Sequence, residues 1–204
     1  MSQNRTYIES DIHPIISARW SPRAFDNSRV VETAKLKACL EAARWASSCF
    51  GEEPWRFIIA DKSRNLDNWQ RMLATLAGKN QLWAKHAQVL ILTCAANNFS
   101  HNGNPNRWAQ YDTGQAMMSL ALQATAEGLI THSMGGFDPS LAAETFSIPD
   151  NFTAMSVTAL GYQGELESLD EGFRSIETVD RQRKPIGEIT FTSWNETWQT
   201  EGRQ

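Results

Sequence analysis

The sequence has no excess of basic residues and no long apolar run. Its 19 Lys and Arg residues face 23 Asp and Glu residues, for a net charge of −4. Nucleic-acid binders use a basic excess to displace counterions from phosphates. The longest apolar run, residues 89–96, is far shorter than the roughly 20 residues of a membrane-spanning helix. We therefore expect neither a nucleic acid nor a membrane as partner.

The sequence also has few cysteines and no visible secretory signal. Its first residues show no basic start followed by an apolar stretch. The cysteines, at positions 39, 49 and 94, form no CxxC pair, and the four histidines lie far apart. An odd number of cysteines without a secretory signal is typical of reduced thiols. These patterns predict a cytoplasmic protein without a metal site.

What the sequence does contain is enough apolar material for a core. Hydrophobic residues make up 41% of the 204 residues, and eight of them are tryptophans. A chain of this length buries about 70% of its unfolded surface, so it needs neither a disulfide nor a structural metal to fold. The tryptophans indicate a rich core, an interface or a pocket lined with flat rings. Because no repeat or linker divides the chain, we expect one domain over residues 1–204.

Hydrophobic periodicity predicts an interleaved set of helices and strands. We expect a short first helix capped by Asp11, a helix that Gly78 stops, and a helix capped by Asp138 with Pro139 at its first position. The expected helices are then 12–16, 33–46, 66–76, 108–127 and 139–146, and the expected strands are 55–60, 88–95, 129–134, 155–162 and 188–194. There is no regular βαβ rhythm and no GxGxxG. This favours an α+β fold with helices flanking a mixed sheet.

The helix expected over residues 108–127 has apolar residues on nearly every side. A helix of that kind must be buried all round. Because the domain is small, the pattern points to burial against a second subunit.

Two basic clusters and a glycine pair are the candidates for binding. Arg19 and Arg23 flank a hydroxyl in a loop, and residues 181–184 carry three cations, so together they could neutralise one dianion. Each cluster can equally be solvated surface. Gly135 and Gly136 precede a helix start and can expose N–H groups to a ligand, or simply form a tight turn. His132 is typical of a hydrogen-bonded strand residue. Without a GxSxG elbow or a P-loop, an enzyme of this sequence would take its reactive group from a cofactor.

Taken in order, five segments resemble the nitroreductase family of FMN-dependent oxidoreductases. Residues 19–25 are similar to its RRSxRxF start, and residues 46–57 to its APSSxNxQPWxF segment. Residues 128–138 contain a GL and a GF element like those that follow its long central helix. Residues 160–162 match its late (I/L)GY strand end, and residues 181–185 its closing basic segment. The five pieces span residues 19–185.

This resemblance implies a mixed, mainly antiparallel sheet flanked by helices, and a homodimer built on the long helix with FMN at the subunit interface. The flavin N5 would carry the chemistry, with no catalytic side chain. By resemblance, the residues at the FMN phosphate, ribityl chain and pyrimidine edge would be Arg19, Trp20, Ser21 and Arg23, with Arg181 and Arg183 completing the phosphate site. Asn80 would supply an amide to the ring, the backbone of Met134, Gly135 and Gly136 would face N5, and Ser48 would come from the other subunit.

The implied activity passes electrons in two half-reactions, from NADPH or NADH to the flavin and then to an electron-poor acceptor such as a nitroarene or quinone. A non-catalytic flavin carrier or sensor remains the alternative. The sequence departs from the family pattern at Ser47, Gly51, Glu53 and Gly135. These departures leave FMN binding in place and the acceptor open.

Overall fold

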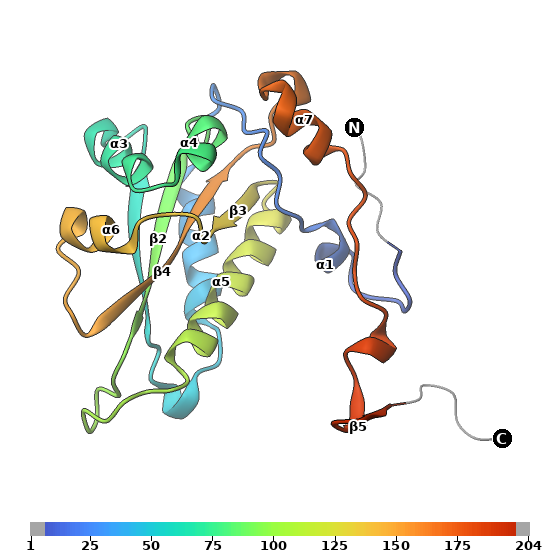
Figure 1. Cartoon of the computed structure of the whole chain (residues 1–204). Helices are drawn as coiled ribbons and strands as arrows, with labels where there is room; N and C mark the ends of the chain where they lie inside the picture. The colour runs from blue at the N-terminus through green and yellow to red at the C-terminus, as the bar shows by residue number, and fades with distance from the viewer. Residues whose placement is uncertain (1–6, 199–204) are drawn as a thin grey trace.

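A four-stranded sheet forms the centre of the molecule. The computed structural model describes residues 7–198 (Figure 1). The strands lie in the order β1-β2-β4-β3, and every pairing within this sheet is antiparallel. Their bounds are β1 Trp55–Asp61, β2 Val89–Ala96, β3 Ile130–Met134 and β4 Phe152–Gly161. This arrangement confirms the predicted α+β class with a mainly antiparallel sheet.

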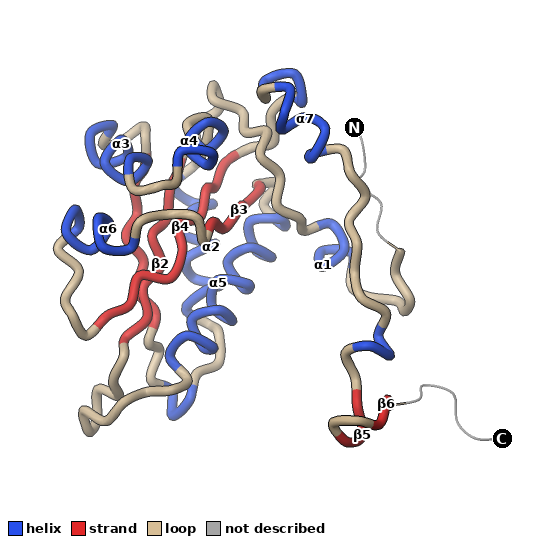
Figure 2. Tube along the Cα trace, in the orientation of Figure 1, coloured by secondary structure: helices blue, strands red, loops and turns tan. Residues whose placement is uncertain are grey.

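Helices cover both faces of this sheet, as Figure 2 shows. On one face, α2 (Thr33–Arg44) packs beside α5 (Ala109–Ala126), around a core that includes Ile91 and Leu120. On the other face lie α3 (Leu66–Ala74), α4 (Gly78–Ala84) and α6 (Pro139–Phe146), around Trp83 and Leu92. The continuous apolar run predicted for β2 follows from this position, because seven of its eight residues are buried.

The remaining elements lie around the edges of the two cores, with Leu166 and Phe173 packed against one of them. Helices α1 (Pro14–Ala18) and α7 (Glu171–Glu177) flank the body, and a C-terminal arm, residues 178–198, runs away from it (Figure 1). The arm contains a short hairpin of β5 (Phe191–Ser193) and β6 (Glu196–Thr197). Within residues 7–198 there are also three 3₁₀ turns: η1 (Cys49–Gly51), η2 (Leu166–Ser168) and η3 (Ile186–Glu188). No helix among residues 7–198 has the length and hydrophobicity to cross a bilayer.

Three local predictions were wrong. The first helix is capped by His13, whose side chain accepts a hydrogen bond from the Ile15 N–H, and not by Asp11. Gly78 begins α4 instead of stopping α3, which ends at Ala74 where the following residues 75–77 bond to residues 136–138. Residues 188–194 are not one strand, since a 3₁₀ turn and a tight hairpin divide them.

The long helix α5 is covered by α2 and the sheet on one side and only partly, by α1, on its outer side. Ala116, Leu120 and Ala124 are fully buried against α2 and the sheet. Tyr111 and Met118 are 67% and 51% exposed. The predicted second subunit would cover this outer side, and that expectation stays a prediction.

Candidate functional site

The two basic clusters meet in one cavity. Arg19 and Arg23 come from the loop that follows α1, and Arg181 and Arg183 come from the start of the C-terminal arm. The cavity measures about 520 Å³. It is lined by Arg19, Trp20, Ser21, Arg23, Ser175, Ile176, Val179, Arg181 and Arg183. The chain thus folds so that residues more than 150 positions apart share one pocket.

Hydrogen bonds hold two of these arginines in place. Arg181 donates from Nη1 to the carbonyl of Arg19 at 2.9 Å and from Nη2 to the carbonyl of Ser17 at 2.7 Å. Arg19 lies with its Nη1 at 3.5 Å from the hydroxyl of Ser21. The Arg181 guanidinium therefore fastens the arm to the end of α1. This attachment places the cationic residues of the arm beside Arg19.

The electrostatics of the cavity favour an anion. Burial lowers the pKa of Arg19, and the charges of Arg181 and Arg183 lower it further. Burial, followed by the charge of Arg183, also lowers the pKa of Arg181. Like charges gathered in a partly buried site raise the free energy of the charged forms, and a bound anion would relieve this repulsion.

Arg23 is in a different situation from the other three arginines. Its Nη1 lies 3.6 Å from the Glu177 carboxylate, at the end of α7. The other carboxylate oxygen of Glu177 accepts the backbone N–H groups of Arg23 and Ala24, at 2.6 and 3.1 Å. Sequence reasoning missed Glu177, because its partners lie more than 150 positions away.

A second group of expected residues gathers at the end of β3. Asn80, on α4, donates its side-chain amide to the carbonyl of Gly136 at 2.9 Å. A Cβ atom on Gly136 would come within 2.8 Å of that amide nitrogen, so a side chain there would displace the Asn80 amide from this position. Met134 is buried, whereas Gly135 is exposed beside Gly136. The structure therefore brings Asn80 to the glycine pair.

His132 contacts both the arginine loop and α4, the helix that carries Asn80. Its Nδ1–H donates to the carbonyl of Pro22 at 3.1 Å, and its ring lies 4.5 Å from the ring of Trp83. Burial lowers the pKa of His132 to about 4, so the imidazole is neutral at pH 7. His132 and Met134 share one side of β3 and lie about 7 Å apart along the strand. His132 is the hydrogen-bonded strand residue that the sequence indicated.

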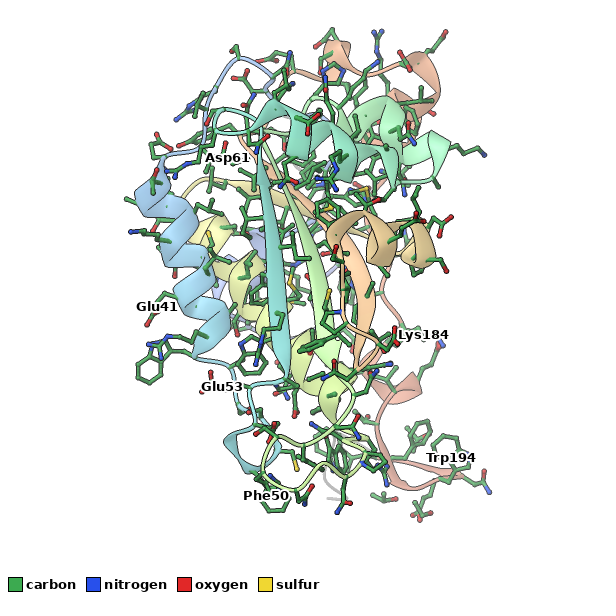
Figure 3. The ribbon with its side chains drawn as sticks, turned by 90° about the vertical axis from the view of Figure 1, so that its left-hand side faces the viewer. Glu41, Phe50, Glu53, Asp61, Lys184 and Trp194 are labelled. Carbon is green, nitrogen blue, oxygen red and sulfur yellow. The ribbon has the colours of Figure 1, made fainter. Side chains whose placement is uncertain are left out.

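Ser48 lies apart from both groups. Its hydroxyl accepts the N–H of Glu53 at 3.0 Å, within a loop fastened to the first turns of α5 by a bond from the Cys49 N–H to Asp112. Figure 3 shows Phe50 and Glu53 at the end of the sheet opposite Asp61. Within one chain, Ser48 does not line the arginine cavity.

The same loop explains one departure from the family pattern. Gly51 has φ +65°, a left-handed conformation that glycine and asparagine tolerate best. Gly51 in place of the family's Asn therefore preserves the backbone. Phe50 and Glu53 also have positive φ values, of 56° and 49°, so the loop is strained on both sides of Gly51.

An apolar groove of about 560 Å³ continues from the cavity and shares three of its arginines. Residues of the N-terminal segment and the outer side of α5 form its walls. They are Tyr7, Ile8, Ile12, Ile16, Met118 and Leu122. The site therefore has a cationic part and an adjoining apolar part.

The fold and the cavity define an α+β protein with a cavity lined by four arginines. A family model described as "Nitroreductase family" matches residues 16–162. The chain therefore belongs to the nitroreductase family, as its sequence motifs indicated.

Individual relatives agree with this assignment. A solved structure described as "The crystal structure of the oxidoreductase containing FMN" is 33% identical, with a TM-score of 0.88, over 96% of this chain and 98% of its own. An uncharacterised 15.4 kDa protein of Mycolicibacterium smegmatis is 32% identical over 67% of this chain and 95% of its own length. The "Putative NAD(P)H nitroreductase YdgI" of Bacillus subtilis is 24% identical over 83% of this chain and 96% of its own length.

Proposed function

We propose that this protein is an FMN-dependent oxidoreductase that passes electrons from NADPH or NADH to an electron-poor acceptor such as a nitroarene or quinone. The observation that carries the proposal is the arginine cavity, where burial and the charges of Arg181 and Arg183 lower the pKa of Arg19. The FMN-containing oxidoreductase whose fold matches at a TM-score of 0.88 supports the same cofactor.

The residues present fit FMN in charge and in size. A phosphate dianion would offset the repulsion among the three guanidinium groups, and each charge-assisted hydrogen bond contributes about 1.5–3 kcal/mol. The cavity volume of about 520 Å³ falls in the usual range of sites for cofactors. Gly135 and Gly136 are exposed, which leaves the backbone at the end of β3 open to a flat ring.

Each group of residues then has its own task. Arg19, Ser21, Arg181 and Arg183 would bind the phosphate and ribityl chain, with Trp20 beside them. Arg23 would lie at the pyrimidine edge, where its charge favours the more negative, reduced form of the ring. Asn80 and the backbone of residues 134–136 would orient the ring. When bound, the flavin supplies the redox chemistry, so the chain's own residues have to bind, orient and exclude water.

The second subunit is part of this proposal. The outer side of α5 exposes Tyr111 and Met118, and the arm exposes Trp194, which is 86% exposed. Tyr, Trp and Met are enriched at subunit interfaces. A homodimer would cover these side chains and bring Ser48 of the other subunit toward the flavin. We also keep as predictions the cytoplasmic location and the folding of residues 1–204 as one domain.

The test begins with the purified protein. It should be yellow or bind FMN with one flavin per chain, and denaturation should release FMN. Anaerobic addition of NADPH or NADH should bleach the visible flavin band, and an electron-poor acceptor should restore it. A bound flavin that neither nucleotide bleaches would favour the carrier or sensor alternative. Release of FAD, or no binding of FMN, would contradict the proposed cofactor.

A further inference from the structure

Glu177 is a buried acid with no part in the expected flavin site. It ends α7, and only 6% of its surface is exposed. One carboxylate oxygen accepts the N–H groups of Arg23 and Ala24, at 2.6 and 3.1 Å. A buried carboxylate is costly unless hydrogen bonds and an opposite charge compensate it. Here both come from the same short stretch of loop.

The rest of that stretch is fixed from other directions. His132 binds the carbonyl of Pro22 at 3.1 Å. The carbonyl of Ala24 accepts the Gly164 N–H at 2.8 Å and the Gln163 side-chain amide at 3.0 Å. The backbone of residues 22–24 is thus held by His132 of β3, by the residues that follow β4, and by Glu177 of α7.

The second carboxylate oxygen acts on the Arg23 side chain. The distance from Arg23 Nη1 to Glu177 Oε2 is 3.6 Å, and the two side chains are 25% and 4% exposed. Because the backbone of Arg23 is already fixed, this contact limits where its guanidinium can lie along the cavity wall. It also offsets the charge of Arg23, whereas Arg19, Arg181 and Arg183 repel one another.

We infer that Glu177 is a positioning residue: it clamps the backbone of Arg23 and Ala24 with one oxygen and orients the Arg23 guanidinium over the cavity with the other. This inference rests on the proposed flavin site. It divides the four arginines by role, with three providing the positive potential for phosphate and Arg23 serving as an oriented group for the ring. Helix α7 is thereby a structural part of the site.

Glu177→Gln separates the charge of this residue from its hydrogen bonds, because the amide oxygen still accepts both N–H groups. We expect Glu177→Gln to weaken FMN and riboflavin binding alike, by about fivefold, since Arg23 acts on the ring that both ligands share. In an Arg23→Ala background the same substitution should change binding by less than about twofold. Glu171→Gln, on the exposed start of the same helix, is the charge-matched control and should bind both flavins normally. Equal effects of Glu177→Gln in both backgrounds, or no effect in either, would overturn the orienting role.

Amide exchange in flavin-free protein tests the clamp independently of flavin binding. Glu177→Ala should speed exchange at the amides of Arg23 and Ala24 by more than about tenfold, whereas Glu177→Gln should retain most of their protection. Unchanged protection in Glu177→Ala would overturn the clamp. If the wild-type protein bound neither flavin, the proposed function would fail, and the exchange measurement would still decide whether Glu177 holds the loop.

Discussion

The body and the C-terminal arm of this molecule are built in opposite ways. In the body, strand β2 is almost wholly buried between two cores, and Leu92 has no exposed surface. In the arm, every residue of β5 and β6 is exposed, and so is Trp194 between these two strands. The body supplies its own hydrophobic contacts, whereas the arm offers apolar side chains that its own chain leaves uncovered. The proposed second subunit would cover these side chains.

The candidate site lies where these two regions join. Arg19 belongs to the body, whereas Arg181 and Arg183 belong to the arm. The bonds from Arg181 to the carbonyls of Ser17 and Arg19 bring the cations together. Ligand binding should therefore depend on both regions, while the stability of the fold depends mainly on the body. Substitutions in each region can separate these two dependences.

The largest effect is expected in the body. Leu92→Ala removes a fully buried side chain from β2 and should lower the free energy of unfolding by about 3 kcal/mol. Urea denaturation of flavin-free protein measures this change. Thr192→Ala, on the exposed β5 of the arm, should change it by less than about 0.5 kcal/mol. Similar losses for the two variants would contradict the division between body and arm.

The next effect is a pH dependence of the stability that arises from His132, which is bonded to the loop that carries Arg19 and Arg23. His132 has a folded pKa of about 4 against an ordinary 6.5, so the unfolded chain takes up the proton first. Above pH 6.5 the neutral His132 does not lower the free energy of unfolding. As the pH falls from 6.5 toward 4, protonation of the unfolded chain lowers this free energy, and below pH 4 the effect of His132 changes no further. The loss should amount to at most about 3 kcal/mol.

His132→Asn keeps a donor for the Pro22 carbonyl but has no titrating group. Denaturation between pH 7 and 4 should show a smaller loss of stability in this variant than in the wild type. Parallel profiles for the two proteins would show that the imidazole does not titrate as its burial requires.

The sequence predicted the parts of the fold that local signals control. Asp138 accepts the N–H groups of Ser140 and Leu141 and starts α6 as expected, with Pro139 at the first position. The apolar run of β2 was equally plain. The prediction that Gly78 stops the preceding helix was wrong. That helix ends earlier because residues 75–77 form backbone hydrogen bonds with residues 136–138, far along the chain.

The candidate site was predictable only as separate pieces. The motifs identified Arg19 and Arg183, but only folding shows that they line one cavity. Glu177 carried no local signal, because what gives it a role is a pair of backbone N–H groups more than 150 positions earlier. Long-range pairing of this kind leaves no periodicity or spacing in the sequence.

A smaller effect is expected in the arm. Trp194→Ala removes an exposed aromatic ring that the proposed partner would bury, and it should weaken dimerisation by about 2 kcal/mol. Sedimentation at several protein concentrations measures the dissociation constant. Trp45→Ala, an exposed tryptophan on the body, is the matched control and should leave it unchanged. A wild-type protein that sediments as a monomer at micromolar concentration would contradict the homodimer itself.

The central claim is that the arginine cavity binds the phosphate of FMN, and the comparison of FMN with riboflavin tests it most directly. Arg183→Ala should weaken FMN binding by roughly tenfold and leave riboflavin binding nearly unchanged, because riboflavin lacks the phosphate. Lys37→Ala, an exposed cation on α2, makes the same change in charge and should affect neither ligand. Equal losses for FMN and riboflavin in Arg183→Ala, or no loss for either, would contradict the claim.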